Sequence, residues 1–153
     1  MSMPILGPVP ELYVSYESSL KLKLEAADLP SWGMSERQIC DLELLMNGGF
    51  NPLKGFLDQD DYISVVETMR LVDGTLWPMP ITLDISQKFA DTVEPGQDIA
   101  LRDQEGVILA ILSISDKYTP NKAREAEMVY GADDLAHPAV NYLHNTAGPV
   151  NLG

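Results

Sequence analysis

One stretch, residues 35–57, limits most strongly how this chain can fold, because it marks both ends of a helix. Ser35 is suited to cap the N-terminus, and Gln38 three positions later can complete a capping box. The apolar residues that recur at helical spacing are Ile39, Leu42, Leu45 and Met46. Gly48 and Gly49 follow, where a left-handed residue is least costly without a side chain. The pattern predicts a capped helix with one apolar face.

The helix is followed by a compact turn. Pro52 and Gly55 favour such a turn, which would return Phe50, Phe56 and Leu57 to the core. None of these residues is an obvious nucleophile, general base or metal-binding set. On physical grounds alone, the stretch is therefore a scaffold.

The residues before this stretch carry weaker signals. Residues 1–10 contain three prolines and one glycine, which favours an extended, poorly ordered leader. Within residues 11–27, lysines alternate with leucines, which favours a strand, although a short helix over residues 18–27 also fits. Residues 31–34 are predicted to form a short strand that leads into the capped helix.

A second helix and a strand are predicted after the turn. Asp58 can cap a helix that runs to Met69, since acidic residues in a first turn are favoured by the helix dipole. Asp73 and Gly74 indicate a turn. Residues 79–86 alternate between apolar and polar side chains, which is typical of a half-buried strand.

The strongest β signal is a hairpin. Residues 97–102 and 107–114 are predicted to be two strands, and the tight connection D-Q-E-G joins them. The second segment is almost continuously apolar, which predicts a central strand that is buried on both faces.

The C-terminal third predicts two helices and an extended end. Pro120 and Asn121 can begin a helix that Gly131 ends. Its inward face is predicted to comprise Ala123, Ala126, Met128 and Val129, and its outward face Lys122, Arg124, Glu125 and Glu127. A last helix is predicted over residues 139–145, and residues 150–153 are extended. Together the elements predict an α+β fold with a small, largely antiparallel sheet or barrel flanked by helices.

Length and charge restrict the possible functions. The 153 residues fit one domain, able to bury about 70% of the surface of its extended chain. The formal net charge is −13 and the isoelectric point is near 4.3. Such a charge repels phosphate backbones and anionic membranes, so we expect neither a nucleic acid nor a membrane as partner. Any site for an anion would need local positive groups.

The cysteine content and the absence of long apolar runs indicate a cytoplasmic protein. The single cysteine, Cys40, excludes an intramolecular disulfide and suits a reducing compartment. No apolar run approaches the ~20 residues of a membrane span, and residues 1–10 lack the charged start of a signal peptide.

Two groups of residues resemble metal ligands, and each has a stronger structural explanation. His137 and His144 would share one side of a helix, but Pro138 places His137 at the helix edge and no third ligand is near. Residues 58–61 resemble the start of a calcium loop, yet the glycine and the distal glutamate of that loop are missing. A helix N-terminus explains these acidic residues.

The other candidates for chemistry are also explained structurally. Cys40 is predicted to be a packed, inert thiol. Gly48 and Gly49 belong to no phosphate-binding motif, and a helix end accounts for them. The three arginines outside the C-terminal helices are too widely separated to form a cluster, and each is expected to pair with a carboxylate. They are Arg37, Arg70 and Arg102.

The sequence R-Q-I-C-D-L-E-L-L-M-N-G-G-F-N-P-L-K-G-F-L (residues 37–57) closely resembles the N-terminal domain of ATP sulfurylase (sulfate adenylyltransferase). The resemblance continues through residues 69–78, 81–84, 99–106 and 131–138. It implies a PUA-like barrel for residues 29–153, with residues 1–28 as a leader and first element. The residues that match the family's signature are expected to be structural: Arg37, Cys40, Asp41, Asn47, Gly48, Gly49, Phe50, Pro52, Gly55 and Phe56.

The resemblance implies that the catalytic chemistry lies elsewhere. Members of the family bind ATP and sulfate in the domain that follows this one, with a Q-x-R-N-P motif and an H-x-G-H motif. This sequence contains neither motif. We therefore carry over no catalytic residue and expect no cofactor in this chain, since ATP and Mg²⁺ are implied only for the catalytic domain.

Two functions from different classes remain. The first is a non-catalytic N-terminal domain of a sulfate adenylyltransferase, inactive by itself, that packs on the catalytic nucleotidyltransferase domain and could also form homo-oligomer contacts. The second is a free-standing PUA-like domain that binds RNA or another protein. The acidic charge argues against RNA, because RNA-binding domains usually present a basic face with exposed aromatic residues.

Overall fold

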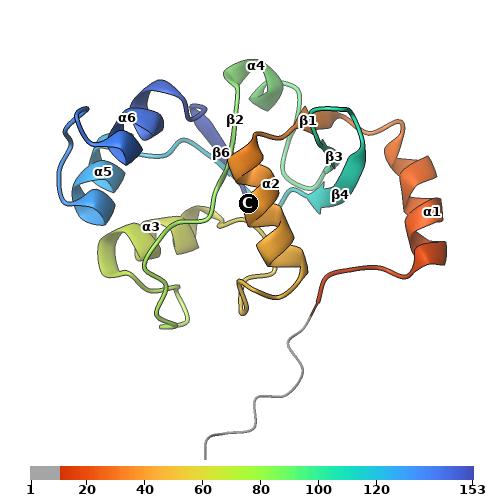
Figure 1. Ribbon diagram of the computed structural model, residues 1–153, viewed down its shortest axis with the longest axis horizontal. Helices are drawn as coiled ribbons and strands as arrows, with labels where there is room; N and C mark the ends of the chain where they lie inside the picture. The colour runs from red at the N-terminus through yellow and green to blue at the C-terminus, as the bar shows by residue number, and fades with distance from the viewer. Residues whose placement is uncertain (1–10) are drawn as a thin grey trace, which may run out of the picture.

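The computed structural model of the chain describes residues 11–153, so the predicted leader, residues 1–10, lies outside the described residues. The elements in chain order are α1 (Tyr16–Ala26), β1 (Ser31–Gly33), α2 (Glu36–Met46), α3 (Gln59–Thr68), β2 (Leu83–Ile85), α4 (Gln87–Ala90), β3 (Asp98–Arg102), β4 (Ile108–Ser113), β5 (Lys117–Tyr118), α5 (Lys122–Tyr130), α6 (Pro138–Asn145) and β6 (Val150–Leu152). Helix α1 lies at one end of the molecule, whereas α3, α5 and α6 lie at the other (Figure 1).

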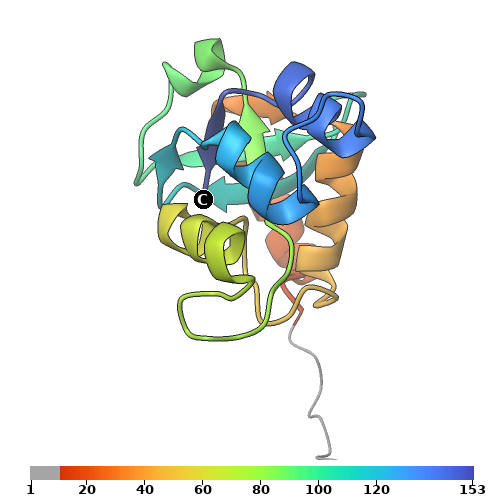
Figure 2. The same ribbon diagram turned by 90° about the vertical axis from the view of Figure 1, so that its left-hand side faces the viewer.

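The strands form two three-stranded sheets. The first has the order β1-β3-β4, in which β1 is parallel to β3 and β4 is antiparallel to it. The second has the order β2-β6-β5, and both of its pairings are antiparallel. In a perpendicular view, α3, α5 and α6 lie in front of the strands (Figure 2). The predicted α+β class is confirmed, and the sheets do not close into a barrel within residues 11–153.

The predicted hairpin is present, but its two strands have the opposite roles in the sheet. Strand β3 is the central strand, and its residues Ile99, Ala100 and Leu101 are buried. Strand β4 is an edge strand whose apolar residues are only partly buried, so the prediction of a central strand there was wrong. A continuous apolar run indicates that both faces of a strand contact other residues, but it does not show that a strand lies on each side. Here β4 pairs only with β3 and contacts α1.

Helix α2 has the predicted ends. The Ser35 hydroxyl accepts a hydrogen bond from the backbone N–H of Gln38 at 3.3 Å, and the Gln38 side chain accepts one from the Ser35 N–H at 3.1 Å. This reciprocal pair is the capping box. At the other end, Gly48 has a φ of 80°, in the left-handed region that favours glycine.

The first helix settles a question that the sequence left open. Residues Tyr16–Ala26 are helical, with Ser15 as the N-cap, so the strand favoured by alternation is wrong there. Only Ala26 of this helix is buried. Leucines at alternate positions lie about 200° apart around a helix, which explains why they do not form one buried stripe.

Two further predictions of secondary structure need correction. The strand expected over residues 79–86 is shortened to β2, because Pro78 and Pro80 lack the N–H groups that a longer ladder would need. The four-residue helix α4, capped by Ser86, was not predicted. Helices α3, α5 and α6 begin and end within two residues of the predicted positions.

The largest group of buried side chains lies between the two sheets and α2. Its fully buried members include Met34, Leu83, Ile85, Ile99, Leu101 and Leu152. A second group gathers around α3 and Tyr118, and a third between α5 and α6. In the part of the chain that the structure describes, no helix is both long enough and apolar enough to cross a membrane.

Candidate functional site

A group of polar side chains, here called the polar junction, connects α2, β2 and α6. It comprises Arg37, Gln38, Asp41, Asp84 and Tyr142. Arg37 is its centre: one guanidinium nitrogen lies 2.7 Å from Asp41 and the other 2.5 Å from Asp84. The same guanidinium donates to the Tyr142 hydroxyl at 3.4 Å. The junction therefore joins three elements through one cation.

The electrostatic environment keeps Arg37 charged. Burial alone would lower the pKa of Arg37, but the hydrogen bond to Tyr142 and the carboxylates of Asp84 and Asp41 outweigh burial and raise it. Because two carboxylates already neutralise this arginine, it is not available to an incoming anion.

Asp84 connects the junction to the segment after α6. One of its carboxylate oxygens accepts from Arg37 and from Gln38, and the other accepts the backbone N–H of Gly148 at 2.7 Å. Gly148 lies so close to β2 that a Cβ atom there would collide with the backbone of Ile85. Only glycine fits at this position without a backbone shift.

Gln38 has a role beyond the capping box. Its amide nitrogen donates to the backbone oxygen of Asp84 at 2.6 Å, and its amide oxygen accepts from the Trp32 indole at 3.2 Å. The side chain is buried, and its polar atoms are paired. Because these partners lie on β1 and β2, Gln38 fixes α2 relative to both sheets.

A buried acidic side chain, Glu125, lies near the junction on α5. One oxygen of Glu125 accepts a hydrogen bond from the Tyr62 hydroxyl at 2.5 Å. Burial raises the pKa of Glu125, and burial together with the nearby Glu125 carboxylate raises the pKa of Tyr62. The prediction that Glu125 faces outward was wrong, and Ala123 and Met128, which were predicted to face inward, are exposed.

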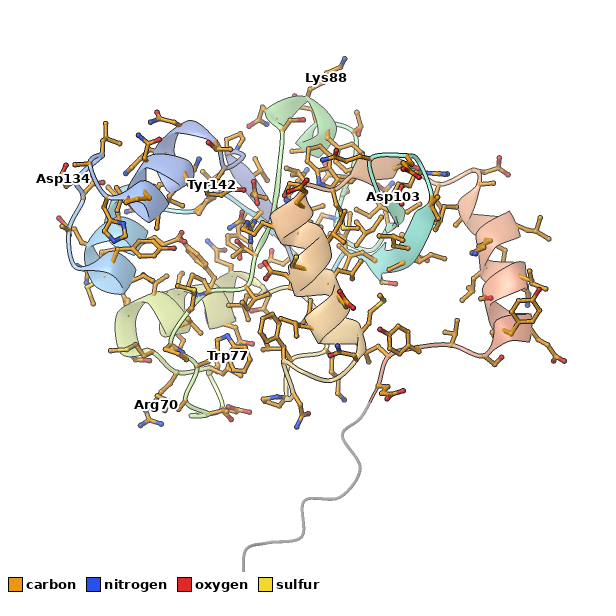
Figure 3. The ribbon with its side chains drawn as sticks, viewed as in Figure 1. Arg70, Trp77, Lys88, Asp103, Asp134 and Tyr142 are labelled. Carbon is orange, nitrogen blue, oxygen red and sulfur yellow. The ribbon has the colours of Figure 1, made fainter. Side chains whose placement is uncertain are left out.

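The remaining arginines differ from the sequence prediction. Arg70 donates to the backbone oxygen of Gly74, and Arg102 donates to the Ser31 hydroxyl and the Gly106 oxygen. Neither forms an ion pair with a carboxylate within the described chain, so that part of the prediction was wrong. Arg70 and Lys88 point outward at separate places on the molecule (Figure 3).

The cysteine also differs from its prediction, because Cys40 is exposed and not packed. It lies two positions from the buried Leu42, which is about 200° around the helix. The signature residues from Asn47 onward lie at the end of α2 and in the turn beyond it. Gly49 donates to the Asn47 side chain, Phe50 packs edge-on against Trp77, and Phe56 is buried.

The candidate metal ligands have structural roles. His137 caps α6, and His144 contacts Asp133 at 2.5 Å. Asp58 caps α3, and Asp61 accepts the Val72 N–H. Across residues 11–153, no three histidine, cysteine or acidic side chains are grouped so as to hold a metal ion.

The sequence of this chain was compared with those of known protein families. The sequence profile of the PUA-like domain matches residues 2–153. The chain belongs to the PUA-like domain family.

The sequence of this PUA-like domain is similar to part of several sulfate adenylyltransferases. It is 53% identical over 135 residues to the sulfate adenylyltransferase of Schizosaccharomyces pombe, covering 87% of this chain and 28% of that protein. It is 48% identical over 151 residues to the sulfate adenylyltransferase of Kluyveromyces lactis, covering 96% of this chain and 30% of the relative. The chain thus spans somewhat more than a quarter of the length of these relatives.

A solved structure has a similar fold. The hexameric APS kinase from Thiobacillus denitrificans matches 74% of the PUA-like domain and 23% of its own chain, with a TM-score of 0.67 and 39% sequence identity.

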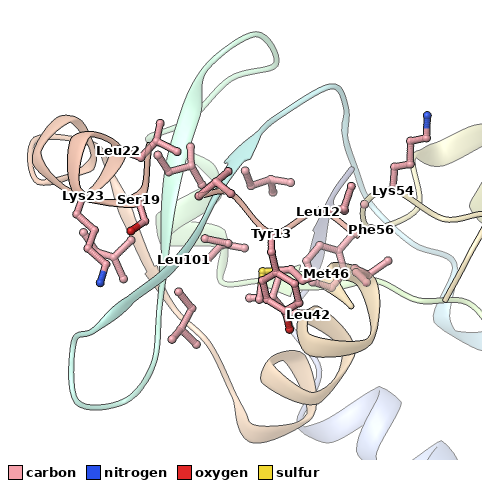
Figure 4. Close-up of a pocket in the computed structure, with 18 residues that line it drawn as sticks. Leu12, Tyr13, Ser19, Leu22, Lys23, Leu42, Met46, Lys54, Phe56 and Leu101 are labelled. Atoms are coloured by element: carbon pink, nitrogen blue, oxygen red, sulfur yellow. The ribbon is translucent and has the colours of Figure 1, made fainter. Parts of the chain in front are cut away.

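The PUA-like domain also has an apolar groove of about 360 Å³ at the α1 end. The groove lies between residues 12–14, α1, α2 and β4, and its walls include Leu12, Leu22, Leu42, Met46, Phe56 and Leu101 (Figure 4). The N–H of Leu12 donates to the oxygen of Met46 at 2.8 Å, which holds the residues just before α1 against the end of α2.

Reasoning from sequence missed several residues of the junction. Asp84 was recognised only as part of the alternating segment 79–86 and of the resembling segment 81–84, and Tyr142 was not singled out. Glu125 could have been found from its spacing, because it lies four positions before Val129 and hence on the same helix face.

Proposed function

We propose that this chain is the N-terminal, non-catalytic domain of a sulfate adenylyltransferase, which converts ATP and sulfate to adenylylsulfate and pyrophosphate. The observation that carries the proposal is the identity of about half the residues to proteins of that name, over most of this chain but little more than a quarter of theirs. On this proposal, the chain packs on the catalytic nucleotidyltransferase domain and supports it.

The distribution of cations supports a non-catalytic role. Stabilising the phosphates of ATP and a sulfate ion requires several donors aimed at one place. Here Arg37 is neutralised by two carboxylates, while Arg70 and Arg102 bind backbone or hydroxyl oxygens at separate positions. We expect ATP and Mg²⁺ to bind only in the catalytic domain, in the cytoplasm.

Contacts between subunits are also part of the proposal. The APS kinase of similar fold is hexameric, and the proposed enzyme could likewise be a homo-oligomer in which this domain contacts a neighbour. Sedimentation of the complete enzyme, with and without residues 11–153, would test whether this domain contributes.

Two assays test the enzymatic part. The chain alone should release pyrophosphate from ATP and sulfate at the background rate, and clear turnover would contradict the proposal. A chimera in which this chain replaces the matching segment of the Schizosaccharomyces pombe relative should remain active. The same chimera with Arg37→Met should be less stable and less active, whereas a chimera with the exposed Lys21→Met should match the parent.

The alternative, a free-standing domain that binds RNA or a protein, predicts a different result. An RNA-binding domain would shift single-stranded RNA in a salt-sensitive way at low ionic strength. Because the chain has a formal net charge of −13, we expect no such shift.

A further inference from the structure

A small cavity of about 230 Å³ lies beside the polar junction, and we call it the junction cavity. Helices α2, α5 and α6 and strands β2 and β6 contribute to its walls, which include Arg37, Asp84, Lys122, Glu125, Tyr142 and Asn151. At ~30 Å³ for each water molecule, the volume corresponds to about eight waters, and it is smaller than the ~300 Å³ of a typical drug-sized site. The cavity therefore suits a ligand of a few heavy atoms.

One wall of the cavity presents an acceptor that has no partner within the described chain. Glu125 is only 6% exposed, and its Oε2 atom accepts from Tyr62. Its other oxygen, Oε1, has no hydrogen-bond partner among residues 11–153, yet no fully occluded side-chain oxygen or nitrogen there lacks one. Oε1 is therefore at least partly exposed, and Glu125 lines the cavity. A donor bound in the cavity could hydrogen-bond this oxygen, and hydrogen bonds between charged groups are the stronger ones.

The cations near Glu125 are engaged elsewhere. Lys122 donates to the backbone oxygen of Ala147 at 2.6 Å, and Arg37 holds Asp41 and Asp84. The charged groups that line the cavity are these two cations and the carboxylates of Asp41, Asp84 and Glu125. Their formal net charge is −1. Sulfate and phosphate are therefore disfavoured, and a small cation is favoured.

We propose that the junction cavity binds a small organic cation with a primary ammonium group that donates to Glu125 Oε1. An ammonium group supplies three donors, which suits an acceptor wall, and its alkyl part would contact Tyr130 and Leu143. Burial raises the pKa of the Glu125 carboxyl in the free protein, and a bound ammonium group would lower it again. This inference is independent of the proposed enzyme family, since it uses only the geometry of this chain.

Titration of the ¹⁵N-labelled chain with ethylammonium chloride, followed by NMR, tests the proposal. We expect saturable shifts at Glu125, Tyr130, Tyr142 and Asn151, with a dissociation constant on the order of millimolar for so small a ligand. Ethanol, a neutral molecule of similar size, and sodium sulfate at matched ionic strength should give no saturable shift at these residues. Equal shifts with ethanol or with the salt, or no saturation, would overturn the proposal.

Two variants of the same helix provide the test and its control. Glu125→Gln keeps the acceptor for Tyr62 but removes the charge, and it should weaken ethylammonium binding at least about tenfold. Glu127→Gln changes an exposed residue and should bind as the wild type does. The dispersion of the NMR spectrum confirms that each variant is folded. Unchanged affinity in a folded Glu125→Gln protein would refute the assignment of the site.

Discussion

Helices α1 and α2 have the same length, 11 residues each, and both begin with a serine N-cap, yet they are held in different ways. In α1 only Ala26 is buried, and the one ion pair, Lys21 to Glu25 at 3.8 Å, is exposed. In α2, Leu42, Leu45 and Gln38 are buried, and Arg37 connects the helix to β2 and α6. Similar local signals therefore produce either a peripheral or a central helix, depending on which residues their side chains contact.

The largest difference between the helices should come from their leucines. Leu45→Ala should lower the free energy of unfolding by about 2–5 kcal/mol, because it removes a core side chain that is 2% exposed. Leu24→Ala on α1 should change it by less than about 0.5 kcal/mol, because Leu24 is 78% exposed. Urea unfolding followed by circular dichroism measures both values. Similar losses in the two variants would show that α1 is as central as α2.

The ion pairs should differ by less. Arg37→Met leaves Asp41 and Asp84 without their cation and should cost about 2 kcal/mol, less than for a fully buried pair because the Arg37 side chain is 36% exposed. Lys21→Met removes only the exposed pair of α1 and should cost at most about 0.5 kcal/mol. The same unfolding assay applies, and an Arg37→Met protein as stable as the wild type would argue against a role for the polar junction in stability.

The caps should give a smaller difference. Ser35→Ala removes the capping box of α2 and should lower the free energy of unfolding by about 1 kcal/mol. Ser15→Ala removes the equivalent bond of α1. Because few buried contacts depend on α1, we expect faster amide exchange within that helix and little effect on global unfolding. Native-state hydrogen exchange by NMR separates the two effects, and a global effect of Ser15→Ala would contradict the comparison.

The smallest effect is expected at Glu125, where substitution by glutamine keeps the bond from Tyr62. Burial raises the pKa of this carboxyl above its ordinary value of 4.5, so the folded state holds the proton more tightly than the unfolded state. The resulting stability is present below pH 4.5 and is lost as the pH rises through the raised value. Relative to Glu125→Gln, the wild type should therefore become less stable between pH 4 and pH 8. Unfolding curves of both proteins across about this pH range measure the difference in their free energies of unfolding. An increase in the stability of the wild type relative to the variant as the pH rises would contradict the prediction.

Local structure was predictable where the signal and its partner lie within a few residues. The capping box of Ser35 and Gln38, the left-handed Gly48, the hairpin turn after β3 and the starts of α3, α5 and α6 all follow from such neighbours. These features depend on backbone hydrogen bonds and dihedral angles, which the nearest residues control. For that reason the sequence by itself determined them.

The candidate site was only partly predictable. Arg37 and Asp41 were identified as members of a signature, but their partners Asp84 and Tyr142 lie 47 and 105 residues from Arg37. Sequence spacing carries no signal for such a contact, because a loop of any length could bring the segments together. The exposed Cys40 and the buried Glu125 were misassigned for a related reason: the chemical type of a residue was used where the rotation of the helix against its neighbours decides burial.

What the sequence by itself determined is the ends of α2, the positions of α3, α5 and α6, the hairpin of β3 and β4, and the α+β class. Only the tertiary structure decided that the strands divide into two sheets, that β3 and not β4 is central, and that Asp84 and Arg37 meet beside a cavity. Hydrogen bonds within a helix or turn form between near neighbours, whereas burial and ion pairing depend on which surfaces pack together. That choice is made by the whole chain, because each buried side chain must fit its neighbours in space.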